Sequence, residues 1–330
     1  MQKITRDMLI EKAQKLLSDG IVSRVLGWKK GEFSYDVTPA IFENVEQMQK
    51  DFIFDDFCGA NFSKYLVKES KKDGKVLVFL KPCDTYSFNQ LLTEHRFDRE
   101  KVYAVGIPCD GMVDINKIKS VVGDGVVSVD TSADALKVDT LYDGVKEVNK
   151  ADVLAERCLN CKSKKHVAYD ELMGDEGDVV DNNRFDEVAK LEAMSADERF
   201  AFWQNELSRC IRCNACRDAW PACTCEKCVF DNPNSGVENK SPANSFEEKL
   251  FHIIRAYHVA GRCTDCGECS RACPQNIPLH LLNRKFIKDI NESYGEYQAG
   301  SEVGQRGPLV NYTVDDVEPC DVFKKGDNDA

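Results

Sequence analysis

The sequence has little of what marks several common classes of protein. Its 44 Lys and Arg residues are outnumbered by 56 Asp and Glu residues, which gives a formal net charge of -12. A nucleic-acid partner would call for a basic face, so the composition argues against one. No apolar run approaches the length of a membrane-spanning helix, and residues 1–20 lack the apolar core of a signal peptide. We therefore expect a cytoplasmic protein with no direct membrane span and no nucleic-acid partner.

Patterns of common catalytic sites are also scarce. The five histidines are scattered, and no Ser/His/Asp or Cys/His arrangement for nucleophilic catalysis stands out. His252 and His258 fall on a predicted helix before Cys263, where we interpret them as packing or surface residues. No Gly-x-Gly-x-x-Gly fingerprint follows a predicted strand, so the sequence gives little support for ordinary dinucleotide binding.

Cysteine, by contrast, is abundant, with 16 copies in 330 residues. Secreted disulfide scaffolds are short chains that cannot otherwise build a core. This chain has ample apolar residues, and many of its cysteines are spaced Cys-x2-Cys. The cysteines therefore predict metal ligands in a reducing compartment.

One cysteine pattern occurs twice between residues 210 and 274. The first copy reads Cys210-x2-Cys213-x2-Cys216-x3-Trp220-Pro221, and the second reads Cys263-x2-Cys266-x2-Cys269-x3-Cys273-Pro274. The second copy is a complete bacterial ferredoxin signature, in which three thiolates bind one 4Fe-4S cube and the fourth binds the neighbouring cube. Two copies predict two 4Fe-4S clusters that exchange ligands. Trp220 stands where the first copy should have its fourth cysteine, and an indole cannot bind iron.

A 4Fe-4S cube needs four ligands, and the chain has enough cysteines to supply four to each of the two predicted clusters. Twelve cysteines lie between Cys158 and Cys273. The first cluster receives Cys210, Cys213, Cys216 and Cys273. The second receives Cys263, Cys266, Cys269 and Cys223. Cys223 takes over from the ligand missing at Trp220, and its exchange with Cys225 stays open because spacing cannot decide it.

The remaining cysteines of this region predict a third site. They form two Cys-x2-Cys pairs, Cys158 with Cys161 and Cys225 with Cys228. Two such pairs separated by a long insert are also what a structural zinc site uses. We prefer a third 4Fe-4S cluster, because Cys225 and Cys228 adjoin the ferredoxin loop and a third cube would extend an electron path.

The N-terminal part contains a second internal repeat. Residues 75–84 and 101–110 are each an apolar run of strand length that ends in Pro-Cys-Asp and precedes helix-like sequence. A strand, helix and strand at this spacing predict a βαβ unit, whose parallel strands bring both turns to one carboxyl edge. These turns have two possible interpretations. In the first they form a functional site, which is a flavin site, a docking surface for a partner or a thiol pair. In the second their cysteines are only small residues that pack well in tight turns. The residues concerned are Cys83, Asp84, Cys109 and Asp110, of which both aspartates are also predicted helix N-caps.

These patterns predict an α/β N-terminal domain with at least a partly parallel sheet, followed by a mostly α domain of the dicluster ferredoxin type. We place the α/β domain at residues 1–150, the iron-sulfur domain at 151–300 and an irregular tail at 301–330. Capping boxes at Ser195 and Ser245 open the helices that lead into the two ligand loops. Residues 126–152 show short strands and charged turns without a specific interpretation.

Six segments together resemble the iron-sulfur β-subunit family. They are Lys81-Pro-Cys-Asp84, Gly106-Ile-Pro-Cys-Asp-Gly-Met-Val-Asp114, Arg157-Cys-Leu-Asn-Cys161, Ser208-Arg-Cys-Ile-Arg-Cys-Asn-Ala-Cys-Arg217, Cys225-Glu-Lys-Cys228 and Ala260-Gly-Arg-Cys-Thr-Asp-Cys-Gly-Glu-Cys269. Members of this family accompany formate dehydrogenases, hydrogenases and heterodisulfide-reductase assemblies in anaerobes, often as β subunits of deazaflavin-reducing enzymes. The resemblance spans roughly residues 75 to 295 and departs at Trp220-Pro221, where the family pattern has Cys-Pro.

The resemblance implies a non-catalytic electron-transfer subunit with two or three 4Fe-4S clusters. It would relay electrons between a catalytic formate dehydrogenase, hydrogenase or related subunit and another redox partner, heterodisulfide-reductase-like subunits included. The alternative is a flavin-containing catalytic β subunit that reduces a nicotinamide, a deazaflavin or another small acceptor. Five arginines flank the ligands and either raise the cluster potentials or only stabilise helix ends. They are Arg209, Arg212, Arg217, Arg262 and Arg271.

Overall fold

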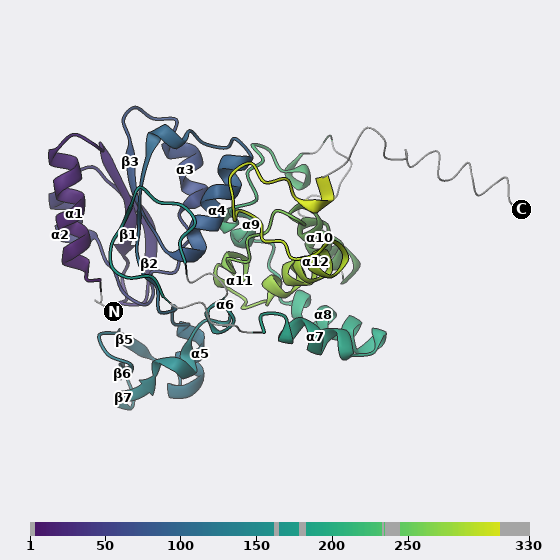
Figure 1. Cartoon of the computed structure of the whole chain (residues 1–330). Helices are drawn as coiled ribbons and strands as arrows, with labels where there is room; N and C mark the ends of the chain where they lie inside the picture. The colour runs from purple at the N-terminus through teal and green to yellow at the C-terminus, as the bar shows by residue number, and fades with distance from the viewer. Residues whose placement is uncertain (1–3, 162–164, 178–182, 233, 235–244, 311–330) are drawn as a thin grey trace, which may run out of the picture.

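The computed structural model describes residues 4–161, 165–177, 183–232, 234 and 245–310, except for the side chains of 245–248. Most of the predicted tail therefore lies outside the described residues. Figure 1 shows an α/β region at one end, a helical region at the other and a small second sheet below the first.

The larger sheet has five strands in the order β2-β1-β3-β4-β8. Their bounds are β1 Arg24–Lys30, β2 Val37–Phe42, β3 Val76–Leu80, β4 Val102–Gly106 and β8 Glu171–Leu172. β1, β3, β4 and β8 pair in parallel, and β2 is an antiparallel edge strand. The prediction of an α/β domain with a partly parallel sheet is confirmed. Residues 171–172, which we assigned to the second domain, form β8 at the other edge of this sheet.

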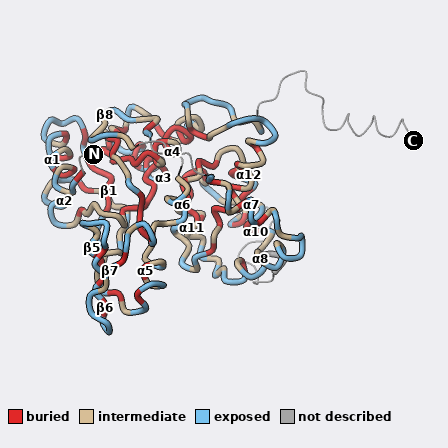
Figure 2. Tube along the Cα trace, turned by 60° about the horizontal axis from the view of Figure 1, so that its bottom comes forward, coloured by how far each residue is buried: buried red, intermediate tan, exposed pale blue. Residues whose placement is uncertain are grey.

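Helices cover both faces of the larger sheet. Their bounds are α1 Arg6–Ser18, α2 Val45–Asp51, α3 Ser63–Glu69 and α4 Pro82–Thr93. α1 and α2 lie on one face, and α3 and α4 lie on the face toward the helical region (Figure 1). β3 is buried along its whole length, as expected for a central parallel strand. Figure 2 shows buried residues running through the central strands and into α3 and α4.

The predicted βαβ unit is present. Leu80 at the end of β3 is in register with Gly106 at the end of β4, so both Pro-Cys-Asp turns lie at one carboxyl edge. The predicted N-caps are wrong. Asp84 is already inside α4, where its Oδ2 accepts a hydrogen bond from Lys81 N at 3.1 Å. The helix after β4, α5 Ile115–Val122, starts later than expected and is capped by Asp114.

A second, three-stranded antiparallel sheet has the order β5-β6-β7. Its strands are β5 Val126–Asp130, β6 Ala135–Thr140 and β7 Gly144–Asn149. Together with α5 it encloses a small core of its own, which includes Ile118, Leu136 and Val138. This sheet occupies the stretch for which the sequence pattern had no specific interpretation.

The remaining helices form the iron-sulfur region. They are α6 Glu156–Leu159, α7 Asp186–Ala193, α8 Ala196–Ser208, α9 Ala215–Ala219, α10 Ser245–His258, α11 Glu268–Arg271 and α12 Leu279–Tyr294. Short 3-10 turns lie at Arg99–Lys101, Lys150–Val153, Val229–Asp231 and Pro308–Val310. The capping box of α8 is confirmed, because Ser195 and Glu198 bond each other's backbone N–H. The Ser245 box rests on side chains outside the described ones. Within the described ranges, no helix is long and apolar enough to cross a membrane.

Candidate metal centre

The two ligand loops adopt the same backbone conformation at equivalent positions. In the first loop Arg212 and Asn214 have positive φ angles of 55° and 63°, and in the second Asp265 and Gly267 have 60° and 68°. Left-handed residues between right-handed ones turn successive N–H groups toward one concavity, which is a common way to bind an anionic iron-sulfur cluster. Three of these residues are not glycine, so their left-handed backbone conformation is unfavourable. Binding of a cluster would offset this cost.

Cysteines of the two copies meet around one apolar cluster. Cys216 lies on α9 and Cys269 on α11, and both are buried there with Leu207, Ile277 and Leu279. Cys210 and Cys273 pack against the same residues. Cys273 of the second copy is thus beside the first loop, as ligand exchange between the copies requires. The assignment of individual ligands stays a prediction.

Two long helices supply hydrogen-bonding groups to the sulfurs of predicted ligands. On α10, His252 Nε2 lies 3.2 Å from Cys210 Sγ, and Arg255 Nη1 donates to Cys216 Sγ at 3.2 Å. On α12, Asn283 Nδ2 donates to Cys269 Sγ at 3.6 Å. Burial lowers the pKa of His252 to about 3, with further lowering from Arg255 and Arg212, so its imidazole is neutral. The sequence interpretation of His252 as a packing residue missed this contact. Its spacing of three from Arg255, which puts both on one helix face, was the available signal.

Trp220 is buried between the two ligand loops. It lines one cavity together with Cys263 and Cys266, and a second cavity together with Cys216 and Cys269. The indole therefore fills space beside both loops. Cys223 packs against the apolar cluster that contains Trp220 and Cys263. This position is compatible with the predicted replacement, but does not test it.

Cys225 and Cys228 lie near Cys223. Burial raises the pKa of the Cys223 thiol. The positive charges of Lys64 and Arg255 oppose this rise, and the neighbouring Cys225 and Cys228 add to it. These three thiols are therefore close enough to interact electrostatically. Any of them has the chemistry to complete the second cluster.

The other predicted pair lies elsewhere. Cys158 and Cys161 line a cavity between the sheet edge and the iron-sulfur region, and the same cavity is lined by Cys83 and Cys109. Neither Cys225 nor Cys228 lines it. The structure thus brings the first pair together with the cysteines of the Pro-Cys-Asp turns.

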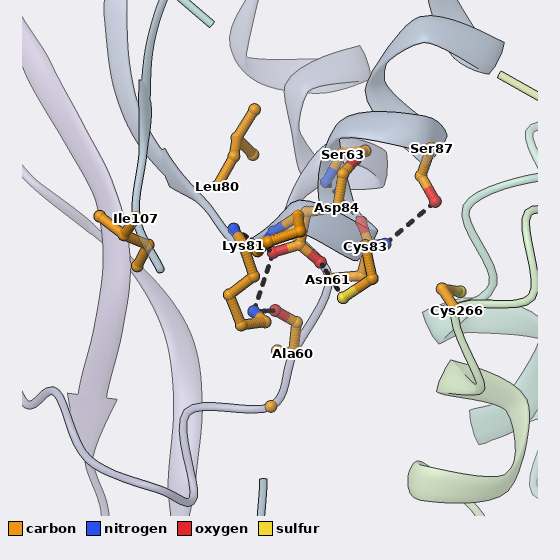
Figure 3. A network of polar contacts seen from close by, with 12 residues as sticks. Ala60, Asn61, Ser63, Leu80, Lys81, Cys83, Asp84, Ser87, Ile107 and Cys266 are labelled. Atoms are coloured by element: carbon orange, nitrogen blue, oxygen red, sulfur yellow. Dashed lines mark hydrogen bonds and ion pairs between the residues drawn. The ribbon is translucent and has the colours of Figure 1, made fainter. Parts of the chain in front are cut away.

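The two aspartates of those turns have different surroundings. Asp84 is 1 % exposed and forms an ion pair at 2.8 Å with Lys81, which is equally buried. Burial would lower the pKa of Lys81, but Asp84 and Cys83 raise it, so this lysine stays charged. Figure 3 shows the pair beside Cys83, with Lys81 also donating to Ala60 O. Asp110, by contrast, is exposed and lines a broad cleft of about 1050 Å³ with Cys109.

Most arginines that flank the ligands in the sequence are engaged by carboxylates. The pairs are Arg209 with Glu206, Arg217 with Asp231, Arg262 with Glu94 and Arg271 with Glu268. Arg212 instead stacks over Phe251, with its guanidinium carbon 4.2 Å from the ring centroid. Sequence spacing missed Arg157, Arg184 and Arg284, which line the cysteine cavity.

A site for a single metal ion differs in geometry from a site for a 4Fe-4S cluster. Among the described residues, no three His, Cys, Asp or Glu side chains are placed to hold one metal ion. Thiolates of a 4Fe-4S site are held further apart, because the cube itself lies between them. The thiol-rich loops, their left-handed residues and the nearby cations fit such a cluster.

Comparisons with known proteins agree with this chemistry. The family model described as a 4Fe-4S dicluster domain matches residues 206–277. The F420-dependent formate dehydrogenase subunit beta of Methanocaldococcus jannaschii is 23% identical over 85% of this chain and 88% of its own length. The F420-dependent formate dehydrogenase 1 subunit beta of Methanococcus maripaludis is 25% identical over 86% of this chain and 88% of its own.

Among solved structures, a chain of the F420-reducing [NiFe] hydrogenase complex from Methanosarcina barkeri aligns with a TM-score of 0.36 and 17% identity. The alignment covers 47% of this chain and 59% of that chain. A likeness at that level supports no conclusion about function. The relatives matched over most of their length, together with the 4Fe-4S domain, support the resemblance to the iron-sulfur β-subunit family: this chain is similar to the F420-dependent formate dehydrogenase β subunits and contains a 4Fe-4S dicluster domain.

Proposed function

We propose that the chain is a non-catalytic subunit that relays electrons between a catalytic dehydrogenase or hydrogenase subunit and a second redox partner. The observation that carries this proposal is the duplicated ligand loop, whose left-handed residues fall at equivalent positions in both copies. The catalytic subunit of a formate dehydrogenase is the first partner to test, because both curated relatives are named as subunits of that enzyme.

The protein's own residues would hold the clusters and set their environment. When bound, a 4Fe-4S cluster accepts or releases one electron with little change in shape. Ligands for two clusters are proposed from the ferredoxin motifs, with Cys223 completing the second. His252, Arg255 and Asn283 place polar groups against three ligand sulfurs. Such contacts, along with burial, adjust the potential of a cluster.

The test is anaerobic reconstitution followed by electron delivery. The full chain with iron and sulfide restored should bind at least about 8 irons, the content of two cubes. Mixed with its co-purified dehydrogenase and the substrate of that enzyme, it should lose the visible absorption of oxidised clusters. The isolated chain should oxidise neither formate nor hydrogen. A fully loaded chain that stays oxidised in the presence of the active dehydrogenase would contradict the relay.

The cleft at the sheet edge favours a second candidate function. It lies at the carboxyl end of parallel strands, where open α/β sheets bind ligands, and it contains Cys109 and Asp110. A flavin there would make the chain a catalytic β subunit for a deazaflavin or nicotinamide acceptor. Acid denaturation of anaerobically purified protein decides between the two: release of a yellow flavin supports this alternative, and a colourless supernatant supports the relay.

A further inference from the structure

We propose that Trp220 is a positioning residue for the relay: with Phe251 it holds the guanidinium of Arg255 against Cys216, and thereby raises the potential of the first cluster. The inference rests on the proposed function, because it takes the ligand loops to hold clusters. It gives a role to the residue that replaces the missing cysteine of the first copy. That role concerns the first cluster, although the missing cysteine would have bound the second.

The side chain of Arg255 lies against two aromatic rings. Its guanidinium carbon is 5.4 Å from the centroid of the Trp220 ring and 4.9 Å from the centroid of the Phe251 ring. Both distances fall within about 6 Å, the range of a cation–π interaction. Nη1 of the same guanidinium donates to Cys216 Sγ at 3.2 Å. The two rings therefore contact the group that reaches the predicted ligand sulfur.

The contacts bring together two segments of the chain. Phe251 and Arg255 are four residues apart on α10, so they lie on one face of that helix. Trp220 directly follows α9, at the end of the first ligand loop. It is 6 % exposed and packs with Val259 and Ile287, which fix the position of its ring. A cysteine at this position would offer no aromatic face to the guanidinium.

Arg255 depends on these rings because it is buried without a counterion. It is 4 % exposed, and its Nη2 has no hydrogen-bond partner. Arg262 pairs with Glu94, but in the described part of the chain no ion pair involves Arg255. The cavity beside it has a volume of about 10 Å³, which leaves room for about one water molecule at most. A buried cation without a partner is unfavourable, and an aromatic face offsets this cost best where water is excluded.

The position of this cation matters for electron transfer. Reduction adds one negative charge to a cluster, so a positive charge fixed beside a ligand sulfur favours the reduced form. Phe251 also stacks with Arg212, whose guanidinium carbon is 4.2 Å from the ring centroid. Among the described cations, Trp220 is in cation–π contact with Arg255 alone. Substitution of Trp220 is therefore the more specific way to release the guanidinium of Arg255.

Redox titration of the reconstituted full chain, followed by electron paramagnetic resonance, tests the inference. The signal that Arg255→Gln shifts identifies the first cluster. Trp220→Leu should move the same signal to lower potential. The ratio of reduced to oxidised cluster at a fixed potential should fall about threefold, which equals about 30 mV for one electron. Trp220→Phe keeps an aromatic face and should behave like wild type. An unchanged signal in Trp220→Leu would overturn the inference.

A double variant tests whether the two residues act through one contact. Trp220→Leu/Arg255→Gln should shift the signal no further than Arg255→Gln alone, because the guanidinium that Trp220 holds is already absent. Shifts that add up would show that the indole acts on the cluster without Arg255, and would overturn the inference. If Trp220→Leu does not load with iron, Trp220→Met fills more of the space, and the same shift is expected.

Ile287→Ala is the matched control. Ile287 packs in the same apolar cluster as Trp220, and its truncation leaves both rings and the guanidinium in place. This variant should keep the wild-type potential. A shift as large as that of Trp220→Leu would show that looser packing changes the potential, and would contradict the role of the aromatic face. A wild-type chain that binds neither iron nor sulfide would instead contradict the relay function itself.

Discussion

Arg255 is the residue best placed to tune a cluster. It is 4 % exposed, its Nη1 donates to Cys216 Sγ, and its Nη2 has no hydrogen-bond partner. A reduced cluster carries one more negative charge, so a buried cation beside its ligand favours reduction. We expect Arg255→Gln to lower one reduction potential by about 40 mV, which equals about 1 kcal/mol for a one-electron step. A redox titration followed by electron paramagnetic resonance measures this shift.

Arg209→Gln is the matched control. Arg209 neighbours Cys210 in sequence, but its side chain is 43% exposed and pairs with Glu206. Solvent screens a charge in that position, so its removal should leave all potentials nearly unchanged. Equal shifts in the two variants would show that net charge, and not the contact with Cys216, is responsible.

Trp220 and Cys223 permit a rescue experiment on the second cluster. If Cys223 replaces the ligand missing at Trp220, then Cys223→Ala should lose about 4 irons. Adding Trp220→Cys restores the complete ferredoxin motif and should return those irons. Iron and sulfide analysis measures both steps. Undiminished iron in Cys223→Ala would assign the ligand to another cysteine, such as Cys225.

The substitution at Trp220 also has a cost in stability. Trp220 is 6 % exposed and packs with Ala222, Val259 and Ile287. A smaller side chain leaves a cavity, so we expect Trp220→Cys alone to lower the free energy of unfolding by about 3 kcal/mol. Thermal unfolding under anaerobic conditions measures this loss. Little change in the melting temperature would mean that the new thiol gains a cluster bond that compensates.

At the scale of elements, the start of α11 depends on Gly267. Its φ is +68°, and a Cβ here would lie 2.6 Å from Arg157 Cβ. That atom is at the base of the side chain and cannot swing away. Arg157 in turn donates to Cys266 O and to Glu268. Gly267→Ala should therefore destabilise the folded protein by about 3 kcal/mol, through backbone strain plus displacement of Arg157.

Gly20→Ala separates the two contributions. Gly20 has nearly the same φ, +67°, but nothing lies within 4 Å of an added Cβ. This variant should lose only about 1 kcal/mol, the cost of a left-handed alanine. Chemical denaturation of both variants gives the comparison. Similar losses at the two positions would show that Arg157 moves aside without cost.

Elements defined by neighbouring residues could be predicted from the sequence, and those defined by distant contacts could not. The ligand loops and the Pro-Cys-Asp turns follow from residues a few positions apart. β8 is only Glu171–Leu172, and it exists because it pairs with β4 far away in the chain. The contacts of His252, Arg255 and Asn283 with sulfur likewise depend on how α10 and α12 pack. For the same reason, spacing grouped Cys158 with Cys225 and could not place it beside Cys83.

At the scale of the whole molecule, contacts with backbone atoms tie the two regions together. Arg157 donates to Gly59 O at 2.7 Å and to Cys266 O at 3.0 Å, which joins the α/β domain to the second ligand loop. Ser87 on α4 and Thr264 in that loop share a hydrogen bond of 2.7 Å. The sequence predicted both regions but not this junction, because its partners are far apart in the chain.

The apolar cores imply that metal removal affects the regions unequally. The core of the larger sheet contains no proposed ligand, whereas the clusters around Leu207 and Trp220 include Cys216, Cys263 and Cys269. Removing iron takes away the bonds that join these loops, because metal binding and folding are coupled. After chelation, hydrogen exchange should accelerate in α9 and α11, while β1 and β3 stay protected. Reconstitution with iron and sulfide should restore the slow exchange. Equal loss of protection in β3 would show that the sheet also needs the metal to fold.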